Sequence, residues 1–360
     1  MSELNVPPAP AIEAAQIGPH CLVTGGAGYL GRVLVRRLRE LGVKVRSFDI
    51  ARHDHGPDVD VRVGDLQDAA AVRAACTGVD TVFHTAALIT LLTMYKTEQR
   101  RRTFSVNVNG TENLLRASAA AGVKALVYTS SFNVALSECA TVQDETLPYA
   151  DHARDLYSLS KIAAERITLA ADNGSGVRTC ALRPGGIWGC DVDSLMVRSF
   201  LTQLAAGKFT ALMGRRSATF DNTHVENLAD AQLLAARALR TATAVAGGHA
   251  YNITDSETVN GMEWFRPLTE GLGYRFPKVW LPEWLQRTIA TSMEAAHFAG
   301  APAPLLTLRG VENLCLGSNL CIDKARRDLG YVPRFNRANG FPQLLPIARE
   351  QIRAWKGKAA

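Results

Sequence analysis

The sequence predicts an α/β fold: a Rossmann-type, doubly wound parallel sheet joined to a smaller C-terminal lobe. Three observations support this prediction. Between about residues 20 and 190, short apolar runs alternate with longer stretches of helical periodicity, which is typical of βαβ units. The short runs are almost continuously apolar, as expected of strands covered by helices on both faces. A glycine cluster, Gly25, Gly28 and Gly31, lies between the first run and the first helical stretch.

The expected elements follow in a regular order along the chain. Residues 1–18 are rich in Pro and Ala without periodicity, and we expect a flexible tail there. Apolar runs predict strands at 20–24, 44–48, 58–63, 81–84, 125–129 and 178–182, and the helical patterns between them include 28–41 and 107–121. After residue 190 the alternation weakens, with helical patterns at 197–206, 225–239 and 263–271 and a Pro-bounded stretch near 280–305. We therefore expect a sheet domain over 19–190 and a smaller mixed lobe over 191–360, between which the chain crosses back.

The composition excludes several classes of protein. The 360 residues are 47% hydrophobic and 21% charged, with a formal net charge of +6, which is typical of a globular protein with a moderately basic surface. Such a surface could attract a dinucleotide or an anionic membrane, but no run of Lys and Arg is interleaved with aromatics as a nucleic-acid binder requires. The seven cysteines form no C-x-x-C pair or metal-ligand spacing, so we expect reduced thiols and no metal site.

The N-terminal segment carries no basic region followed by an apolar run, so it is not expected to be a secretory signal peptide. No stretch of the sequence is apolar for long enough to span a bilayer. Together these features predict a cytoplasmic protein.

The glycine cluster reads TGGAGYLG over residues 24–31, and its position between a strand and a helix predicts a dinucleotide site. Gly25 permits a tight turn, Gly28 lets the backbone approach a pyrophosphate, and Gly31 lets the helix pack closely on the strand. The N-terminus of the following helix offers free N–H groups and a positive dipole end to the phosphates. Tyr29 and Leu30, within the glycine cluster, are also expected to bind the cofactor.

The ends of the next strands supply the rest of the predicted cofactor site. Asp49 follows the second strand, where a carboxylate binds the ribose 2′-OH of NAD and repels the 2′-phosphate of NADP. Arg46 and Arg52 lie nearby and would soften that repulsion, but the pattern favours NAD. The predicted site also includes residues that follow the third and fourth strands: Asp65, Leu66, Ala86 and Ala87. For Asp65, the cap of a following helix is the alternative interpretation.

A Tyr and a Lys four residues apart, Tyr157 and Lys161, open a helix after the fifth strand. Side chains at i and i+4 share a helix face, and a neighbouring ammonium favours the phenolate of a Tyr whose ordinary pKa is about 10. The phenol can then act as a general base near neutral pH. Ser131, at the end of the fifth strand, would hold the substrate oxygen. The pattern Y-x-x-x-K is common alone, and it is informative here because it accompanies the glycine cluster and the strand-ending serines.

Together these motifs resemble the extended short-chain dehydrogenase/reductase superfamily. The resemblance covers about residues 19–335 and includes His84–Ala87 and the segment RPGGIWG over 183–189. Within that superfamily the chain most resembles the 3β-hydroxysteroid dehydrogenase/Δ5-isomerase family, especially its bacterial cholesterol-dehydrogenase branch. The segments that carry this closer likeness are SVNVNGTENLL (105–115), TLPYADHARDLYSLSK (146–161) and SNLCIDKARRDLGY (318–331).

The resemblance implies a role for each matching residue. Tyr157 is the expected catalytic acid/base, and Lys161 is its partner, which also binds the nicotinamide ribose. Ser131 matches the catalytic serine better than Ser130 does. Asn107 matches an asparagine that orders a proton-relay water, with a helix-cap or loop hydrogen bond as the alternative. The resemblance further implies that Pro184 and Ile187 line the nicotinamide carboxamide, that the smaller lobe binds the substrate, and that the chain forms a homodimer.

The expected reaction is NAD-dependent oxidation of the 3β-hydroxyl of a sterol or steroid to a ketone, with Δ5 to Δ4 isomerisation as a second step to which no residue is assigned. One alternative is a decarboxylating 4-carboxysterol 3-dehydrogenase, for which Arg215 and Arg216 are weak candidates for the required cation. A long-chain β-hydroxy acid oxidoreductase is another. A nucleotide-sugar epimerase is disfavoured because residues 186–191 read GIWGCD, and a non-catalytic NAD-binding sensor is disfavoured because both Tyr157 and Lys161 are present.

One departure from mammalian relatives concerns the membrane, because this chain lacks their long apolar anchoring segments. Residues 280–298 instead place several apolar side chains on one helical face, with Trp284 beside it: Leu281, Leu285, Ile289, Met293 and Ala296. We expect either packing of this face against the core or a peripheral entrance helix that contacts a membrane and collects a sterol.

Overall fold

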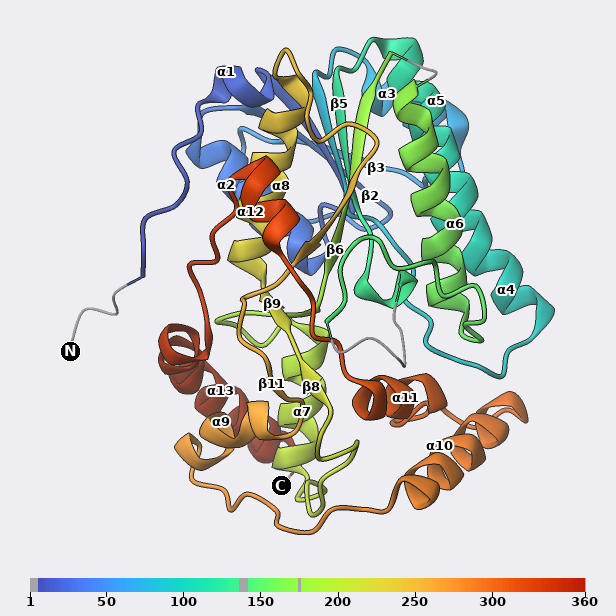
Figure 1. Ribbon diagram of the computed structural model, residues 1–360, viewed down its shortest axis with the longest axis vertical. Helices are drawn as coiled ribbons and strands as arrows, with labels where there is room; N and C mark the ends of the chain where they lie inside the picture. The colour runs from blue at the N-terminus through green and yellow to red at the C-terminus, as the bar shows by residue number, and fades with distance from the viewer. Residues whose placement is uncertain (1–5, 136–141, 174–175, 360) are drawn as a thin grey trace.

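Figure 1 shows a computed structural model of the chain, which describes residues 6–135, 142–173 and 176–359. Its centre is a seven-stranded sheet in which every neighbouring pair is parallel. In spatial order the strands are β10 (Ala250–Ile253), β6 (Arg178–Pro184), β5 (Ala125–Thr129), β4 (Thr81–His84), β1 (His20–Thr24), β2 (Lys44–Asp49) and β3 (Asp60–Val63). The chain winds outward from β1 in both directions, which confirms the predicted doubly wound Rossmann-type fold.

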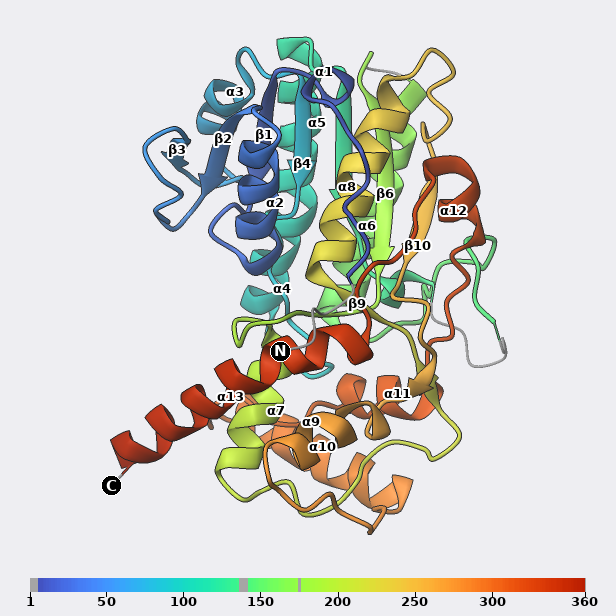
Figure 2. The same cartoon turned by 90° about the vertical axis from the view of Figure 1, so that its left-hand side faces the viewer.

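Helices cover both faces of the sheet (Figure 2). One face carries α2 (Tyr29–Glu40) and α8 (Val225–Arg240), and the other carries α3 (Ala69–Cys76), α5 (Gly110–Ala121) and α6 (Leu156–Ala170). Covering both faces leaves the carboxyl edge of the strands as the open side of the sheet, and ligands of doubly wound proteins bind at that edge.

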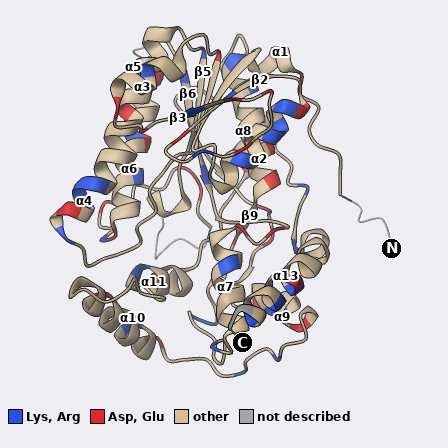
Figure 3. Cartoon of the chain, turned by 180° about the vertical axis from the view of Figure 1, so that it is seen from behind, with Lys and Arg blue, Asp and Glu red and all other residues tan. Residues whose placement is uncertain are grey.

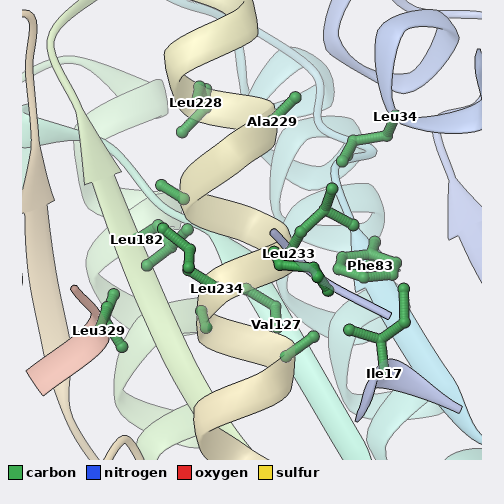
Figure 4. Packing of buried hydrophobic residues seen from close by; sticks show 14 of the residues in the cluster. Ile17, Leu34, Phe83, Val127, Leu182, Leu228, Ala229, Leu233, Leu234 and Leu329 are labelled. Carbon is green, nitrogen blue, oxygen red and sulfur yellow. The ribbon is translucent and has the colours of Figure 1, made fainter. Parts of the chain in front are cut away.

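The packing of the central strands explains why they are apolar along their whole length. Figure 4 shows Leu234 of α8 lying close to Val127 of β5 and Leu182 of β6, and all three side chains are buried. Leu22 and Leu126 of the same sheet belong to the second core cluster, under α3 and α5. Because each strand buries both of its faces, the alternation of polar and apolar residues seen in half-exposed strands is absent.

The smaller lobe lies beyond the carboxyl ends of the strands (Figure 1). It contains α7 (Leu195–Ala205), α9 (Arg266–Gly271), α10 (Glu283–Phe298), α11 (Leu308–Leu316), α13 (Arg337–Ala359) and two small sheets, in which β7 (Gly186–Trp188) pairs with β9 (Asn222–His224) and β8 (Thr219–Phe220) pairs with β11 (Val259–Asn260). Trp188 packs edge to face on Trp264, with ring centroids 5.1 Å apart, at the centre of this lobe.

The chain crosses between the two parts. The helix α8, the strand β10 and the short helix α12 (Asp323–Leu329) come from the second half of the sequence but pack in the sheet domain. A single boundary at residue 190 therefore does not separate the two parts.

Two expectations about the elements were wrong. Within the expected flexible tail, residues 14–17 form the helix α1 (Ala14–Ile17), because Ile17 is fully buried and its carbonyl oxygen accepts a hydrogen bond from the Thr81 hydroxyl at 2.5 Å. Residues 1–5 of that tail lie outside the described residues. The helix expected over 107–121 starts earlier, because α4 (Thr97–Phe104) runs through a π-helical segment (Ser105–Asn109) into α5.

Positions of Lys and Arg are interspersed with positions of Asp and Glu along the ribbon seen from behind in Figure 3. Many of them pair locally, as Arg39 does with Asp58 at 2.6 Å and Arg36 with Glu40 at 2.7 Å. Across the described part of the chain, no helix combines the length and the apolar character needed to cross a membrane.

Candidate active site

The glycine turn between β1 and α2 leaves no room for side chains. Gly25 has a φ of +72°, and a Cβ there would lie 2.7 Å from the backbone of Ala86. A Cβ on Gly31 would lie 2.0 Å from the carbonyl oxygen of Gly25. The helix α2 begins at Tyr29, and its N-cap, Gly28, has no side chain to satisfy the first N–H groups. Those donors and the positive end of the helix dipole form a site suited to a pyrophosphate.

Asp49, the last residue of β2, lies against this turn. Its carboxylate accepts hydrogen bonds from the backbone N–H groups of Ala27 at 3.1 Å and Ala51 at 3.0 Å. Arg46 points elsewhere, because its guanidinium pairs with Asp60 at 2.8 Å and donates to two carbonyl oxygens of the α3 end. The Asp49 carboxylate would therefore repel the 2′-phosphate of NADP, and Arg46 would not offset that repulsion. This arrangement suits NAD.

The remaining predicted cofactor residues surround the same strand ends. Asp65 accepts hydrogen bonds from the backbone and side-chain amides of Gln67, at 2.9 and 3.0 Å. The alternative role of Asp65 as a helix cap is wrong, because Asp68 caps α3 and accepts from the N–H groups of its first turn. Leu66 is buried. Ala86 and Ala87 are half-buried after β4, and Ala86 is the residue that touches Gly25.

The buried His84 ties these strands together. One ring nitrogen is 2.7 Å from the Thr24 hydroxyl of β1, and the other is 2.9 Å from the Thr111 hydroxyl of α5. Burial, with a smaller contribution from the Lys161 charge, lowers the pKa of His84 to about 3. His84 is therefore neutral at physiological pH and bridges two hydroxyls.

Tyr157 and Lys161 occupy successive turns at the start of α6, whose N-cap is Asp155. Their spacing follows from the helix, because residues four apart lie one above the other. The buried Lys161 ammonium donates to the carbonyl oxygen of Thr129 at 2.7 Å. It also lies 4.6 Å from the centroid of the Tyr128 ring and 5.9 Å from that of Tyr157.

Burial shifts the pKa values of the phenol and of the ammonium in opposite directions, in each case against the charged form. Burial raises the pKa of Tyr157 to about 12, a hydrogen bond with Ser131 lowers it, and the Asp155 charge raises it. Burial lowers the pKa of Lys161 to about 7, and the Glu165 carboxylate raises it. Any further positive charge beside this pair favours the phenolate, so the arrangement suits proton transfer at Tyr157.

The two strand-ending serines have different partners. The Ser130 hydroxyl donates to the fully buried carboxylate of Glu165, which also pairs with Arg183 at 2.5 Å and accepts from the Tyr149 hydroxyl at 3.0 Å. Ser130 thus belongs to a network that joins β5, α6 and β6. Ser131, in contrast, lies beside the Tyr157 phenol. The geometry brings Ser131, Tyr157 and Lys161 together and leaves Ser130 outside this group.

Asn107 lies in the π-helical segment and is buried. Its side chain accepts from the backbone N–H of Leu88 at 2.7 Å, and donates to the carbonyl oxygen of Leu88 and the hydroxyl of Ser160, both at 2.9 Å. These contacts match the loop hydrogen bond that the sequence left as an alternative. The expected water-ordering role stays a prediction.

The segment after β6 passes close to the glycine turn. Pro184 ends β6, and the N–H of Gly185 donates to the Thr223 hydroxyl at 2.8 Å. Ile187 lies in β7, half-buried. A Cβ on Gly189 would lie 2.1 Å from the hydroxyl of Tyr29, so this segment and the start of α2 are in direct contact.

Sequence reasoning missed the polar residues that join the smaller lobe to this site. Arg309 of α11 is buried and pairs with Asp155 at 3.2 Å, and Glu294 of α10 is buried against the loop after β4. The cations proposed for a decarboxylase do not join the site's residues: Arg215 pairs with Glu283 at 3.0 Å, and Arg216 lies over the Trp280 ring.

Comparison with known proteins consistently identifies relatives in one family of steroid dehydrogenases. The model of the 3-beta hydroxysteroid dehydrogenase/isomerase family matches residues 22–283. The 3 beta-hydroxysteroid dehydrogenase/Delta 5→4-isomerase of Mycobacterium tuberculosis is 44% identical over 344 residues, which cover 94% of this chain and 92% of that protein. The 3-beta-hydroxysteroid dehydrogenase of Mycolicibacterium neoaurum is 39% identical over 334 residues, covering 90% of each.

Among solved structures, MoeE5 in complex with UDP-glucose and NAD superposes with a TM-score of 0.72 at 23% identity, over 92% of this chain and 99% of that one. This likeness concerns the fold alone. The match to the family model and the sequence identities over nine-tenths of the chain establish the family as well as the fold. The chain therefore belongs to the 3-beta hydroxysteroid dehydrogenase/isomerase family, whose members are NAD-dependent oxidoreductases.

Proposed function

We propose that this protein oxidises the 3β-hydroxyl of a sterol or steroid to the 3-ketone with NAD. The observation that carries the proposal is the group formed by Ser131, Tyr157 and Lys161 at the carboxyl edge of the sheet. The glycine turn and Asp49 occupy the same edge, where a dinucleotide would bind. Membership of the family supports a 3β-hydroxysteroid as the substrate.

In this proposal Ser131 orients the substrate hydroxyl by hydrogen bonding, and Tyr157 accepts its proton. Lys161 stays in place through its bond to Thr129, and an ammonium has two further donors for the hydroxyls of a ribose. NAD, when bound, supplies the hydride acceptor for C3. Burial raises the pKa of Tyr157 to about 12, and the positive charges of Lys161 and of the nicotinamide ring would favour the phenolate and so support general-base catalysis.

A Δ5 to Δ4 isomerisation would follow from the chemistry of the product. A ketone at C3 of a Δ5 steroid acidifies the C4 proton, and moving the double bond gives the conjugated Δ4 ketone. Relatives that carry this activity in their names support the proposal. The ultraviolet absorbance of the conjugated ketone distinguishes this product from the unconjugated one.

The sequence alternatives are less well supported. A decarboxylase would need a cation near C4, but Arg215 is paired with Glu283. An epimerase would need an anchor for a second diphosphate, which the segment after β6 does not supply. A non-catalytic sensor would not need the contact between Ser131 and Tyr157.

We also propose a cytoplasmic protein that contacts membranes peripherally through α10. The inner side of this helix is Gln286, Ala290 and Glu294, whereas Trp284 is 68% exposed and Ile289 is 38% exposed. Leu285 and Met293 of the expected apolar face are half-buried, so that face is only partly used in packing. Binding to anionic vesicles at low salt, lost in Trp284→Ser, tests the contact. Light scattering tests the homodimer that the resemblance implies.

The function is tested by following NADH formation with a panel of 3β-hydroxysteroids and, separately, a panel of UDP-sugars, each with NAD and NADP. We expect turnover of steroids with NAD. Tyr157→Phe should lower kcat by about 10²- to 10⁴-fold, since general-base catalysis contributes about that much. Undiminished turnover in Tyr157→Phe, or activity confined to UDP-sugars, would contradict the proposal.

A further inference from the structure

The loop between β4 and α4 is held at three points along its length. Leu88 is bound at both its N–H and its carbonyl by Asn107. The carbonyl oxygen of Thr90 accepts a hydrogen bond of 3.1 Å from the backbone N–H of Tyr157. The far part of the loop is bound by Glu294. The loop is thus in direct contact with the helix that carries the catalytic phenol, and its far end depends on a residue of the smaller lobe.

Glu294 is fully buried in α10, and its carboxylate accepts four hydrogen bonds. One oxygen accepts from Thr93 through both its backbone N–H, at 2.9 Å, and its hydroxyl, at 2.6 Å, and from the N–H of Met94 at 3.0 Å. The other oxygen accepts from the N–H of Leu308, at the start of α11, at 2.8 Å. Burial of a carboxylate is tolerated only where hydrogen bonds or ion pairs replace water. Here backbone and hydroxyl donors supply the replacement.

The helix α11 contacts the other side of the catalytic group. Arg309, the residue after Leu308, pairs with Asp155, the N-cap of the helix that carries Tyr157. Its guanidinium also donates to the side-chain oxygen of Asn133, two residues after Ser131, at 3.4 Å. Figure 1 shows α10 and α11 side by side below the ends of α4 and α6. One helical pair therefore contacts both the loop after β4 and the residues flanking the catalytic hydroxyls.

We propose that Glu294 is a positioning residue for steroid binding, which fixes the loop 88–94 as one wall of the substrate site while α11 forms the opposite wall. Within the loop, Ile89 is 54% exposed and Met94 is 36% exposed, so apolar side chains are available to contact a steroid. Because Glu294 joins the loop to α11 through one carboxylate, it sets the spacing between the two walls. The inference rests on the proposed function.

The test compares Glu294→Gln and Glu294→Ala with the wild-type enzyme, using pregnenolone and saturating NAD. In Glu294→Gln the amide oxygen can still accept from Thr93 and Met94, but the amide NH2 group would face the N–H of Leu308, so one hydrogen bond is lost. In Glu294→Ala all four hydrogen bonds are lost. We expect the steroid KM to rise about tenfold or more in Ala and by less in Gln. The kcat should stay within about threefold, and the Kd of NADH should not change. Glu283→Gln is the matched control, because Glu283 is on the same helix and pairs at the surface with Arg215 and Arg287.

A purely structural role would give a different result, because a loss of folded enzyme lowers kcat at constant KM. That outcome, or an equal rise of KM in Glu283→Gln, would overturn the inference. If Glu294→Ala does not fold, Thr93→Val removes only the hydroxyl bond and should raise the steroid KM by about threefold. The Kd of the steroid for the NADH complex is measured in parallel. An equal Kd in wild type and Glu294→Gln overturns the role of Glu294, whereas steroid binding without turnover in wild type overturns the proposed function alone.

Discussion

The ammonium of Lys161 lies 4.6 Å from the centroid of the Tyr128 ring. Tyr128 is buried beneath the site, and its own hydroxyl has no hydrogen-bond partner among the described residues. The aromatic face is therefore the part of Tyr128 that the site uses. A ring face attracts a cation, and for a buried pair the attraction reaches about 2 kcal/mol.

Removing the Tyr128 ring should alter the pH dependence of catalysis. In Tyr128→Leu the Lys161 ammonium loses part of its stabilisation, so its pKa falls below about 7 and less positive charge remains beside Tyr157. The phenol pKa then rises, and the ascending limb of the pH profile of kcat/KM for steroid oxidation should move to higher pH. Tyr128→Phe keeps the ring and should behave like wild type. The same shift in both variants would show that the hydroxyl, and not the ring, supports Lys161.

The sequence predicted the parts of the site that are close together in the chain. The glycine turn, Asp49 at a strand end, and the Tyr157–Lys161 spacing are local patterns whose geometry follows from one strand or one helix turn. The partner of Ser130 was not predictable, because Glu165 and Arg183 lie on elements whose proximity is set only by the order of strands in the sheet.

The helix α10 shows why the periodicity of side chains can mislead. The apolar positions of 280–298, Ile289 among them, predicted one face that packs on the core or contacts a membrane, yet the fully buried residues of this helix are Ala290 and two polar residues, Gln286 and Glu294. Gln286 exchanges hydrogen bonds with the backbone of Gly214, and Glu294 accepts from backbone donors of the loop after β4 and of the start of α11. A sequence pattern records which side chains are polar, but not which distant backbone groups will satisfy them.

Substituting the two serines separately should distinguish catalysis from stability. Ser131→Ala removes the hydroxyl beside Tyr157, and should lower kcat by about 10²-fold or more with little change in stability, as when a single oxyanion donor is lost. Ser130→Ala leaves the buried Glu165 with one donor fewer, which should cost about 1.5–3 kcal/mol of unfolding free energy. Urea denaturation and steady-state kinetics on both proteins check this. Comparable kcat losses in the two variants would contradict the assignment of Ser131.

The cofactor preference should depend on Asp49. Asp49→Asn keeps an oxygen that can accept from Ala27 but removes the negative charge, so the KM for NAD should rise about tenfold and the preference over NADP should narrow. Asp54→Asn is the control, because this exposed carboxylate in the following loop accepts only from the backbone of Gly56 among the described residues. Steady-state kinetics with both cofactors measure the ratio. A ratio that is unchanged in Asp49→Asn would place the ribose elsewhere.

The buried His84 should make the fold sensitive to mild acid. Its pKa is lowered to about 3 in the folded state by burial and then by the Lys161 charge, whereas an imidazole in the unfolded chain titrates near 6.5. Between these two values the unfolded state binds the additional proton, so stability contributed by neutral His84 is complete above pH 6.5 and is lost as the pH falls toward 3. Each unit of pH in that window costs up to about 1.4 kcal/mol.

The variant His84→Gln removes this titration but keeps a side chain that can bond to Thr24 or Thr111. It should be less stable than wild type at pH 7.5, and the difference should shrink between pH 6.5 and 5, because only the wild type loses the contribution of the neutral imidazole. Unfolding free energies from urea titrations at several pH values give the two slopes. Equal slopes of unfolding free energy against pH in the two proteins would mean that His84 is not the group whose protonation opposes folding. Another buried histidine with the same property is His224, whose pKa burial also lowers to about 3.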